Sequence, residues 1–413
     1  MERELALMIL SDYERNQTFL NIALNHAFQV QKKDFSKELV TALVYGTIQH
    51  RLMLEYQLEP SVKGKRIKLF ERMVLLMSMY EHLYMNMPDY AIVNEAVRIV
   101  KKKRGRQAAS FVNAILRNSF EHKRSLDDLK KEERLSIETS HPLWMVKMFI
   151  KQYGFKTCEK ILHANNEVPL KSARVNMLKI SREALLEKDH HFIASSHSED
   201  CVFYQGGTIA ESEAFKNGWV TIQDESSQLV GRFLSPDKGS RVLDMCCAPG
   251  SKTTHLSAIM DNTGSIDAYD LYAHKIHLVE DNAKRLGVTN LTTHVGDSTD
   301  IHCFEGEYDY ILLDGPCSGL GVLARKPEIR YHDSNAMDEI ILLQKKLLEN
   351  AYTLCKNKGI IVYSTCTLNK KENEKQVEAF IKAHPDMHIL EERTVLPYEL
   401  HSDGFYMCRL RKD

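Results

Sequence analysis

The second half of the chain alternates short apolar segments with longer amphipathic ones, and this alternation restricts its fold more than any other feature of the sequence. Short apolar runs indicate buried strands, and apolar residues that recur every three or four positions indicate helices. Predicted strands cover 241–245, 265–270, 291–295, 308–313, 359–364 and 405–410, and predicted helices cover 254–260, 275–286, 336–354 and 372–383. Strands that alternate with helices predict a doubly wound, mostly parallel α/β sheet with helices on both faces.

Residues suited to ligand binding follow the first two predicted strands. In such a sheet, ligands bind beyond the carboxyl ends of the strands. Residues 244–253 (DMCCAPGSKT) follow the first strand. Their small side chains let the backbone approach a ligand closely, and the next helix offers free N–H groups. Asp270 follows the second strand, where a carboxylate can accept hydrogen bonds from the ribose of a nucleoside cofactor, although it can equally cap the next helix.

Three later strand ends carry further reactive side chains. Asp297 follows the third strand, residues 314–319 (DGPCSG) follow the fourth, and residues 364–367 (STCT) follow the fifth. A single aspartate at a strand end is a common helix cap. Three aspartates and two cysteines at successive strand ends exceed what capping explains, so we expect a functional site at this edge of the sheet.

Residues 1–125 show a helical pattern and no alternating strand pattern, which predicts an all-α N-terminal domain. The front of the chain is basic: residues 1–150 contain 24 Lys and Arg against 18 Asp and Glu, whereas the remainder contains 31 against 38. A basic cluster lies at Lys101, Lys102, Lys103, Arg104 and Arg106. Such a cluster favours contacts with phosphates, although a charge run can also be a solvated helix end.

Residues 126–215 separate these two regions. A charged segment at 121–140 predicts a linker helix, and strand candidates at 172–176 and 201–204 predict a small α+β module. The expected domains are therefore 1–125, 126–215 and 216–413. The nine cysteines lack the dense, even pattern of a secreted scaffold, the N-terminus does not resemble a signal peptide, and no apolar run reaches the roughly 18 residues of a membrane span. These features predict a reduced, cytoplasmic protein.

Three segments together resemble the RNA cytosine-5 methyltransferases of the Sun/Nol1/Nop2 family: DMCCAPGSKT at 244–253, DGPCSG at 314–319 and STCTLNKKENE at 364–374. The similarity extends over the whole chain, and the helical front end is similar to NusB, as in bacterial members of the family that modify 16S rRNA. The resemblance implies a Rossmann-like domain that transfers a methyl group from S-adenosyl-L-methionine to carbon 5 of a cytosine in 16S rRNA. We also expect a monomer that binds no metal and no membrane.

Two cysteines suit this chemistry. A thiolate that adds to carbon 6 of cytosine makes carbon 5 nucleophilic, and cysteine is a strong nucleophile for such covalent catalysis. The resemblance assigns the nucleophile to Cys366, the resolution of the adduct to Cys317, and contact with the cytosine or the cofactor to Asp314. Residue chemistry alone does not choose between the cysteines, because DNA cytosine-5 methyltransferases use the cysteine of a Pro-Cys pair, which here is Cys317.

The resemblance also assigns binding residues. Residues 246–252 would hold the methionine end of the cofactor, Asp270 its ribose and Asp297 its adenine. The expected cofactor-binding residues are Cys246, Cys247, Ala248, Pro249, Gly250, Ser251, Lys252, Asp270, Asp297 and Asp314. The expected RNA-binding residues are Lys101, Lys102, Lys103, Arg104, Arg106 and Arg174.

Two other functions stay open. The chain could methylate tRNA, or it could be a non-catalytic RNA-binding assembly or antitermination factor built on its front end. The presence of Asp270, Asp314, Cys317 and Cys366 argues against the non-catalytic factor, because a degenerate enzyme should lose some of them. By resemblance, the helical front end favours rRNA over tRNA.

Overall fold

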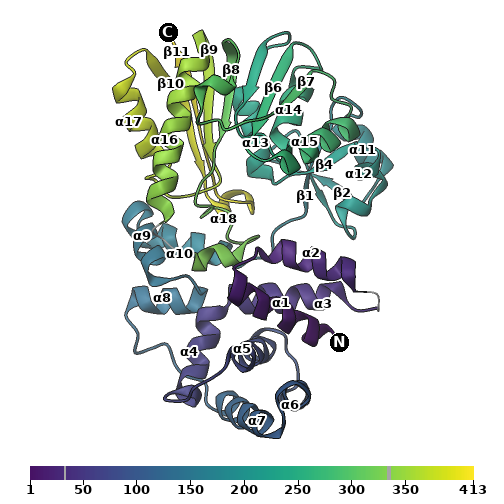
Figure 1. Ribbon diagram of the computed structural model, residues 1–413, viewed down its shortest axis with the longest axis vertical. Helices are drawn as coiled ribbons and strands as arrows, with labels where there is room; N and C mark the ends of the chain where they lie inside the picture. Colours follow the sequence, from purple (N-terminus) through teal and green to yellow (C-terminus); the bar gives the residue numbers. More distant parts are fainter. Residues whose placement is uncertain (32–33, 333–335) are drawn as a thin grey trace. The chain divides into compact units, whose positions relative to one another are not determined.

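A computed structural model describes residues 1–31, 34–332 and 336–413 (Figure 1). The chain forms two compact units. The first contains Met1–Asn166 together with Arg325–His332, and the second contains the rest. The expected division into three domains is finer than these two units and stays a prediction.

The first unit, within its described residues, consists of helices and their connections. These are α1 (Glu2–Asn16), α2 (Leu20–Val30), α3 (Lys37–Gln49), α4 (Arg51–Val62), α5 (Leu69–Tyr84), α6 (Asp89–Arg104), α7 (Arg106–Glu121), α8 (Lys131–Thr139), α9 (Leu143–Tyr153), α10 (Phe155–Ala164) and the short η3 (Pro327–Tyr331). Ile9, Val44 and Val100, which lie in the predicted apolar stripes, are buried in its core, whereas Met8 is exposed. The predicted all-α front end is confirmed.

The linker helix expected over 121–140 is shorter than predicted, because α8 begins only at Lys131. Ser125 and Asp127 explain the late start. The Ser125 hydroxyl accepts a hydrogen bond from the Asp127 backbone N–H at 3.0 Å. Local side-chain to backbone bonds of this kind compete with helix formation.

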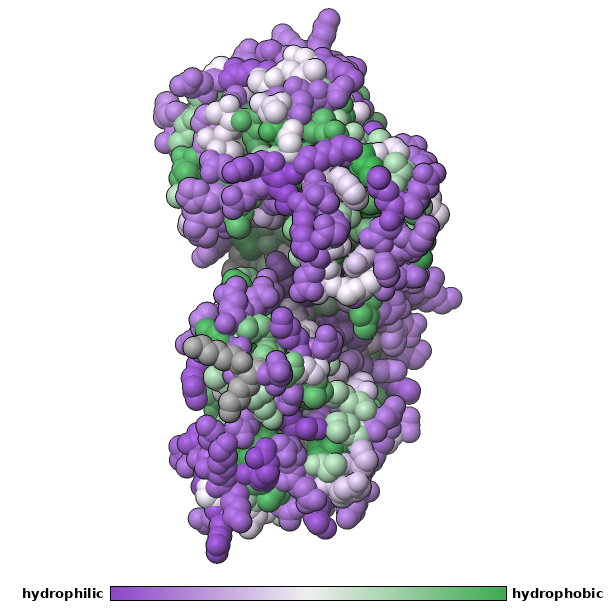
Figure 2. All heavy atoms as spheres, turned by 90° about the vertical axis from the view of Figure 1, so that its right-hand side faces the viewer, coloured by the Kyte–Doolittle hydropathy of each residue, from purple (hydrophilic) through white to green (hydrophobic). Residues whose placement is uncertain are grey.

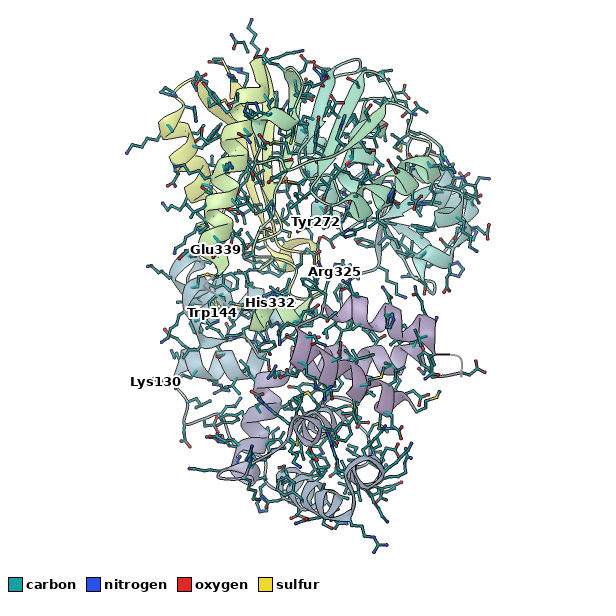
Figure 3. The ribbon with its side chains drawn as sticks, in the orientation of Figure 1. Lys130, Trp144, Tyr272, Arg325, His332 and Glu339 are labelled. Atoms are coloured by element: carbon teal, nitrogen blue, oxygen red, sulfur yellow. The ribbon has the colours of Figure 1, made fainter. Side chains whose placement is uncertain are left out.

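Residues 325–332 are distant in sequence from the rest of the first unit, yet they pack within it. Figure 3 labels the two ends of this segment, Arg325 and His332. The completely buried side chain of Arg330 donates hydrogen bonds to carbonyl oxygens at three helix ends. The acceptors are Gln49 at the end of α3, Thr139 at the end of α8 and Asn165 after α10, at 3.0, 3.2 and 2.9 Å. The last carbonyls of a helix lack partners within it and carry partial negative charge, so one cation satisfies three helix ends.

The second unit begins with a small antiparallel sheet in the order β2-β3-β1-β4. Its elements are β1 (Ser172–Val175), α11 (Arg182–Lys188), β2 (Phe192–Ala194), β3 (Cys201–Tyr204), η1 (Ile209–Glu211), α12 (Glu213–Lys216) and β4 (Val220–Ile222). The predicted α+β module is thereby confirmed, although the short strands β2 and β4 were not predicted.

The larger sheet has seven strands in the order β10-β11-β9-β8-β5-β6-β7 (Figure 1). The strands are β5 (Arg241–Asp244), β6 (Ser265–Asp270), β7 (Leu291–Val295), β8 (Tyr308–Asp314), β9 (Cys355–Thr365), β10 (Met387–Val395) and β11 (Phe405–Lys412). Five neighbours, β9 to β7, run parallel; beside β9, β11 pairs antiparallel, and β10 pairs antiparallel with β11. The predicted doubly wound, mostly parallel Rossmann-like sheet is confirmed.

Helices cover both faces of this sheet. They are α13 (Glu225–Leu234), α14 (Ser251–Ile259), α15 (Ala273–Leu286), α16 (Ala336–Leu354), α17 (Glu374–Ala383) and α18 (Pro397–Leu400). The helices α16 and α17 pack on the face that carries Leu313, and α13 and α14 pack on the face that carries Leu312. Since successive strand residues point to opposite faces, a continuous apolar strand such as β8 serves both cores.

No helix among the residues that the structure describes is long and apolar enough to cross a membrane. Hydrophilic side chains cover most of the face drawn in Figure 2.

Candidate active site

The carboxyl ends of β5, β8 and β9 lie side by side, because these strands are parallel neighbours in the sheet. Asp244 ends β5 and Asp314 ends β8, and the register pairs Asp314 with Ser364 near the end of β9. The loops that follow parallel strands meet at one edge. The loop after β8 therefore brings Cys317 to the same place as Cys366, which directly follows β9.

The sulfur atoms of Cys317 and Cys366 are 3.2 Å apart, and both cysteines are free and partly buried. The hydrogen bond between the two sulfurs lowers the pKa of Cys366 and raises the pKa of Cys317 well above its usual range. The ammonium of Lys252 also lowers the pKa of Cys366. These directions favour the proton on Cys317 and the thiolate, the form of cysteine that attacks, on Cys366.

Lys252 and Asp314 form an ion pair beside the cysteines, with Nζ 2.7 Å from Oδ2. The hydroxyl of Ser364 donates a hydrogen bond of 2.8 Å to the other oxygen of Asp314, and the Phe405 ring lies 5.3 Å from the lysine Nζ. Burial disfavours the lysine ammonium, but the adjacent carboxylate outweighs this effect and raises the pKa of Lys252. The side chains thus present a fixed cation and a fixed carboxylate to the site.

The turn between β5 and α14 is built from buried contacts. Asp244 accepts a hydrogen bond of 2.7 Å from the hydroxyl of Thr253, and burial raises the pKa of this carboxyl to about 7. Gly250 precedes α14 with a φ of +96°, and a Cβ there would meet the Cα of Val279 at 3.0 Å. Only glycine fits this left-handed position against a neighbouring helix.

Not all side chains of the loop 246–252 are accessible to a ligand. Cys247 is buried in a small core cluster with Val279, and Cys246 packs against another cluster. Burial raises the pKa of both thiols, as expected for packing residues. The carbonyl of Pro249 accepts a hydrogen bond of 2.9 Å from Asn282. A ligand at this loop would therefore meet its backbone and Lys252.

Two of the predicted aspartates, Asp270 and Asp297, lie at the carboxyl ends of β6 and β7. Asp270 ends β6 and is largely buried; its Oδ1 accepts a hydrogen bond of 3.1 Å from the Tyr272 N–H. Asp297 lies after β7 and is exposed, and the Thr299 backbone N–H holds its pKa below the usual range. Among the described residues, no group of three His, Cys, Asp or Glu side chains could hold a metal ion.

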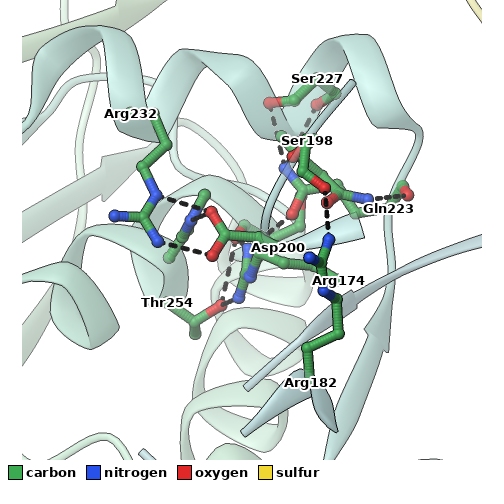
Figure 4. Close-up of polar contacts among 11 residues, drawn as sticks. Arg174, Arg182, Ser198, Asp200, Gln223, Ser227, Arg232 and Thr254 are labelled. Atoms are coloured by element: carbon green, nitrogen blue, oxygen red, sulfur yellow. Dashed lines mark hydrogen bonds and ion pairs between the residues drawn. The ribbon is translucent and has the colours of Figure 1, made fainter. Parts of the chain in front are cut away.

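The side chain of Arg174 is buried, contrary to the expectation that it contacts RNA. Figure 4 shows the polar side chains around it. Its guanidinium donates to Gln223 Oε1 at 2.5 Å, to Thr254 Oγ1 at 3.1 Å and to the carbonyl of Ser251. Burial lowers the pKa of Arg174 to about 9. From β1 of the small sheet, this side chain fixes the first turn of α14.

The basic cluster at Lys101–Arg104 and Arg106 lies in the first unit, and all five side chains are exposed. It occupies the last turn of α6 and the start of α7. Lys102 pairs with Glu4 at 3.1 Å, and Arg104 lies 3.8 Å from Glu71. Exposed cations with so few acidic partners are available for phosphate contacts.

Sequence reasoning missed two buried polar residues close to the cysteine loops, Glu372 and Gln344. Both hydrogen-bond the segment that carries Cys317. Glu372 belongs to segment 364–374, which resembles the methyltransferase family. Its position only six residues after Cys366 could have indicated that it lies near the cysteines. Gln344 lies on an amphipathic helix and gave no signal at all.

Comparisons with known proteins agree with this geometry. Residues 232–411 match the family model described as 16S rRNA methyltransferase RsmB/F, residues 1–121 match the NusB family, and residues 141–203 match a ferredoxin-like domain of RsmF/B-like methyltransferases. A solved structure titled Crystal Structure of PH0851 superposes with a TM-score of 0.84 at 23% identity, covering 100% of this chain and 99% of its own. A methyltransferase homolog protein from Pyrococcus horikoshii is 26% identical with a TM-score of 0.63, covering 69% of this chain and all of its own.

Curated relatives extend over the full length. A probable ribosomal RNA small subunit methyltransferase B from Bacillus subtilis (strain 168) is 38% identical over 99% of this chain and 98% of the relative. A protein with the same description from Synechocystis sp. is 31% identical over 99% of both chains. With these relatives and a matching family model over its sheet domain, the chain belongs to the RsmB/F family of 16S rRNA methyltransferases.

Proposed function

We propose that this chain transfers a methyl group from S-adenosylmethionine to carbon 5 of a cytosine in 16S rRNA, through a covalent bond between Cys366 and carbon 6 of the base. The observation that carries the proposal is the pair of thiols 3.2 Å apart at the ends of adjacent strands, beside the Lys252–Asp314 ion pair. The relatives described as small subunit rRNA methyltransferases support 16S rRNA as the substrate.

The residues at the strand ends fit the cofactor. Gly250 lets α15 pack against the turn before α14, whose backbone stands at the carboxyl end of β5, and Asp270 and Asp297 offer carboxylates to hydroxyl and amino groups of a nucleoside. The loop 246–252 and Asp314 would hold the methionine end. When bound, S-adenosylmethionine supplies an electrophilic methyl group.

The chain's own residues supply the remaining chemistry. The Cys366 thiolate forms a bond to carbon 6, and the electrons of the ring double bond make carbon 5 nucleophilic. After carbon 5 gains the methyl group, loss of its proton restores the double bond and releases the Cys366 thiolate. Cys317 takes part in resolving the adduct. Asp314, held by Lys252 and Ser364, would hydrogen-bond the ring.

The target base has to leave its stack, because carbons 5 and 6 are not accessible to a thiolate within a paired helix. We propose that the reaction takes place on the cytosine of a loop or on a flipped base. The reaction needs both thiols in reduced form, which fits the cytoplasm. It needs no residue from a second subunit, so we propose a monomer.

Methyl transfer to 16S rRNA tests the proposal directly. With labelled S-adenosylmethionine, we expect incorporation at one cytosine of 16S rRNA and recovery of 5-methylcytosine after digestion. Equimolar tRNA is the control and is expected to stay unlabelled. Label on tRNA alone would show the wrong substrate, and absence of S-adenosylmethionine binding by calorimetry would favour a non-catalytic RNA-binding factor.

Neutralising the basic cluster is expected to weaken RNA binding more than chemistry. Replacing Lys101, Lys102 and Lys103 with glutamine should raise the KM for RNA roughly tenfold or more and leave kcat within about twofold, because each lost phosphate contact weakens binding by a salt-dependent amount. Steady-state kinetics at two salt concentrations measures both.

A matched control separates this cluster from the general effect of charge. The control variant replaces three exposed lysines on α16 and α17 with glutamine: Lys345, Lys375 and Lys382. It removes the same amount of positive charge from another part of the surface. We expect a much smaller change in KM. Equal effects of the two triple variants would mean that the cluster is a solvated surface.

A further inference from the structure

Glu372 is completely buried between the two loops that carry the cysteines. Its carboxylate accepts hydrogen bonds from the backbone N–H of Ser318 at 2.8 Å and from the Ser318 hydroxyl at 2.5 Å. It also accepts from the side-chain amides of Asn369 at 3.0 Å and Gln344 at 3.1 Å. All four contacts are donors, which matches the acceptor oxygens of a carboxylate.

These contacts hold the residues on both sides of Cys317 and reach the residue that follows Cys366. Ser318 follows Cys317, and its hydroxyl lies 2.8 Å from that of Thr367, which follows Cys366. On the other side of Cys317, the carbonyl of Pro316 accepts a hydrogen bond of 2.9 Å from Gln344, the same amide that donates to Glu372. The single carboxylate therefore connects the two loops and α16.

Further backbone bonds make this contact region rigid. The N–H of Gly321 donates to the carbonyl of Cys366 at 3.0 Å, and the hydroxyl of Tyr363 donates to the carbonyl of Glu372 at 2.6 Å. A Cβ at Gly321 would come within 1.9 Å of the carbonyl oxygen of Gly404. A buried polar network that is fully satisfied holds one arrangement of its members.

We propose that Glu372 is a positioning residue for the reaction: it holds Cys317 against Cys366, and its negative charge keeps the shared proton on Cys317. This inference rests on the proposed function, in which Cys366 attacks as the thiolate. Glu372 itself touches neither substrate nor cofactor and acts through Cys317.

The charges around the pair support this asymmetry. On the Cys317 side, the hydrogen bond to Cys366, burial and the carboxylate of Glu372 all raise the pKa of Cys317. On the Cys366 side, the cation of Lys252 opposes Asp314 and Asp403. The phenol of Tyr363 is also close enough to Cys317 to interact with it, and its own pKa is raised well above the usual range by burial, so it stays neutral. The hydrogen bond between the sulfurs and the carboxylate of Glu372 therefore favour the proton on Cys317, whereas Asp314 and Asp403 work against Lys252 on the other side.

The test removes the charge and keeps the shape. In full-length protein carrying Cys366→Ala, alkylation of Cys317 by iodoacetamide is followed against pH by mass spectrometry of its peptide. We expect Glu372→Gln to lower the pH midpoint of alkylation by about one unit, because a negative charge beside the thiol is lost. With Cys366 intact, we expect the same replacement to lower kcat about tenfold or more and to leave the KM for RNA unchanged.

Two further variants make the result decisive. Glu372→Asp keeps the charge but shortens the reach, so it should lower kcat while leaving the alkylation midpoint in place. Glu374→Gln removes a neighbouring charge that pairs with Lys370 and should change neither. An unshifted midpoint in Glu372→Gln, or an equal shift in Glu372→Asp, would overturn the proposal. The alkylation needs no RNA, so this result stands even if the wild-type protein forms no covalent adduct with RNA.

Discussion

Replacing Cys366 with alanine is expected to reduce methyl transfer by a factor of about 10⁴ or more, since removal of a covalent nucleophile leaves only binding and positioning. The thiol of Cys317 remains, 3.2 Å from the position of the removed sulfur, and burial and the carboxylate of Glu372 still act to raise its pKa. The measurement is the rate of labelled methyl transfer to 16S rRNA under saturating conditions. A denaturing gel of the same reaction should show no protein–RNA adduct.

Cys317→Ala is the matched contrast to this variant, because it removes the neighbouring thiol and leaves Cys366. We expect the adduct to form and then persist, so that a slower band of protein joined to RNA accumulates on the denaturing gel while turnover is lost. Both variants should bind S-adenosylmethionine as the wild type does. The reverse pattern, with adduct only in Cys366→Ala, would make Cys317 the nucleophile.

Replacing Arg330 with alanine is expected to lower the free energy of unfolding of the first unit by about 3 kcal/mol or more. The side chain is fully buried and satisfies carbonyls at the ends of α3, α8 and α10, and its own charge is costly there, since burial lowers its pKa to about 10. Without it, three helix ends face the interior with unpaired acceptors.

The two tryptophans of the chain make this measurement specific. Trp144 lies on α9 in the first unit, and Trp219 lies in the second, so a Trp219→Phe background reports urea unfolding of the first unit alone through Trp144 fluorescence. Arg117→Ala, which removes an exposed arginine of α7, is the control and should stay within about 0.5 kcal/mol of the parent. If Arg330→Ala lowers the free energy of unfolding by no more than the control does, the three contacts do not have the structural role described.

Local patterns in the sequence predicted most of the sheet. The strands β3, β6 and β7 begin and end where the apolar segments do, and α16 has its predicted bounds. The parallel direction of the strands follows from the alternation of strands and helices, so the grouping of Asp314, Cys317 and Cys366 at the carboxyl ends of the strands could be predicted as well.

Contacts between distant segments could not be predicted in this way. The edge strand β10 is mostly exposed and lacks a buried apolar run, so its pattern did not indicate a strand. Arg174 and Arg330 carry charges that suggest a surface position, and only their carbonyl and side-chain acceptors, which come from distant residues, explain their burial. Glu372 is a similar case, because two of its partners, Ser318 and Gln344, come from a distant loop and from α16.

The assignment of residues 325–332 to the helical unit has a consequence for synthesis on the ribosome. This unit contains the start of the chain, but its structure is completed by a segment that ends at residue 332 of 413. Domains generally fold as the nascent chain emerges, N-terminal parts first. Here the helices of this unit are synthesised before Arg330. Until residues 325–332 have been translated, together with most of the strands of the larger sheet, the carbonyls at three helix ends lack their partner and are accessible to chaperones and proteases.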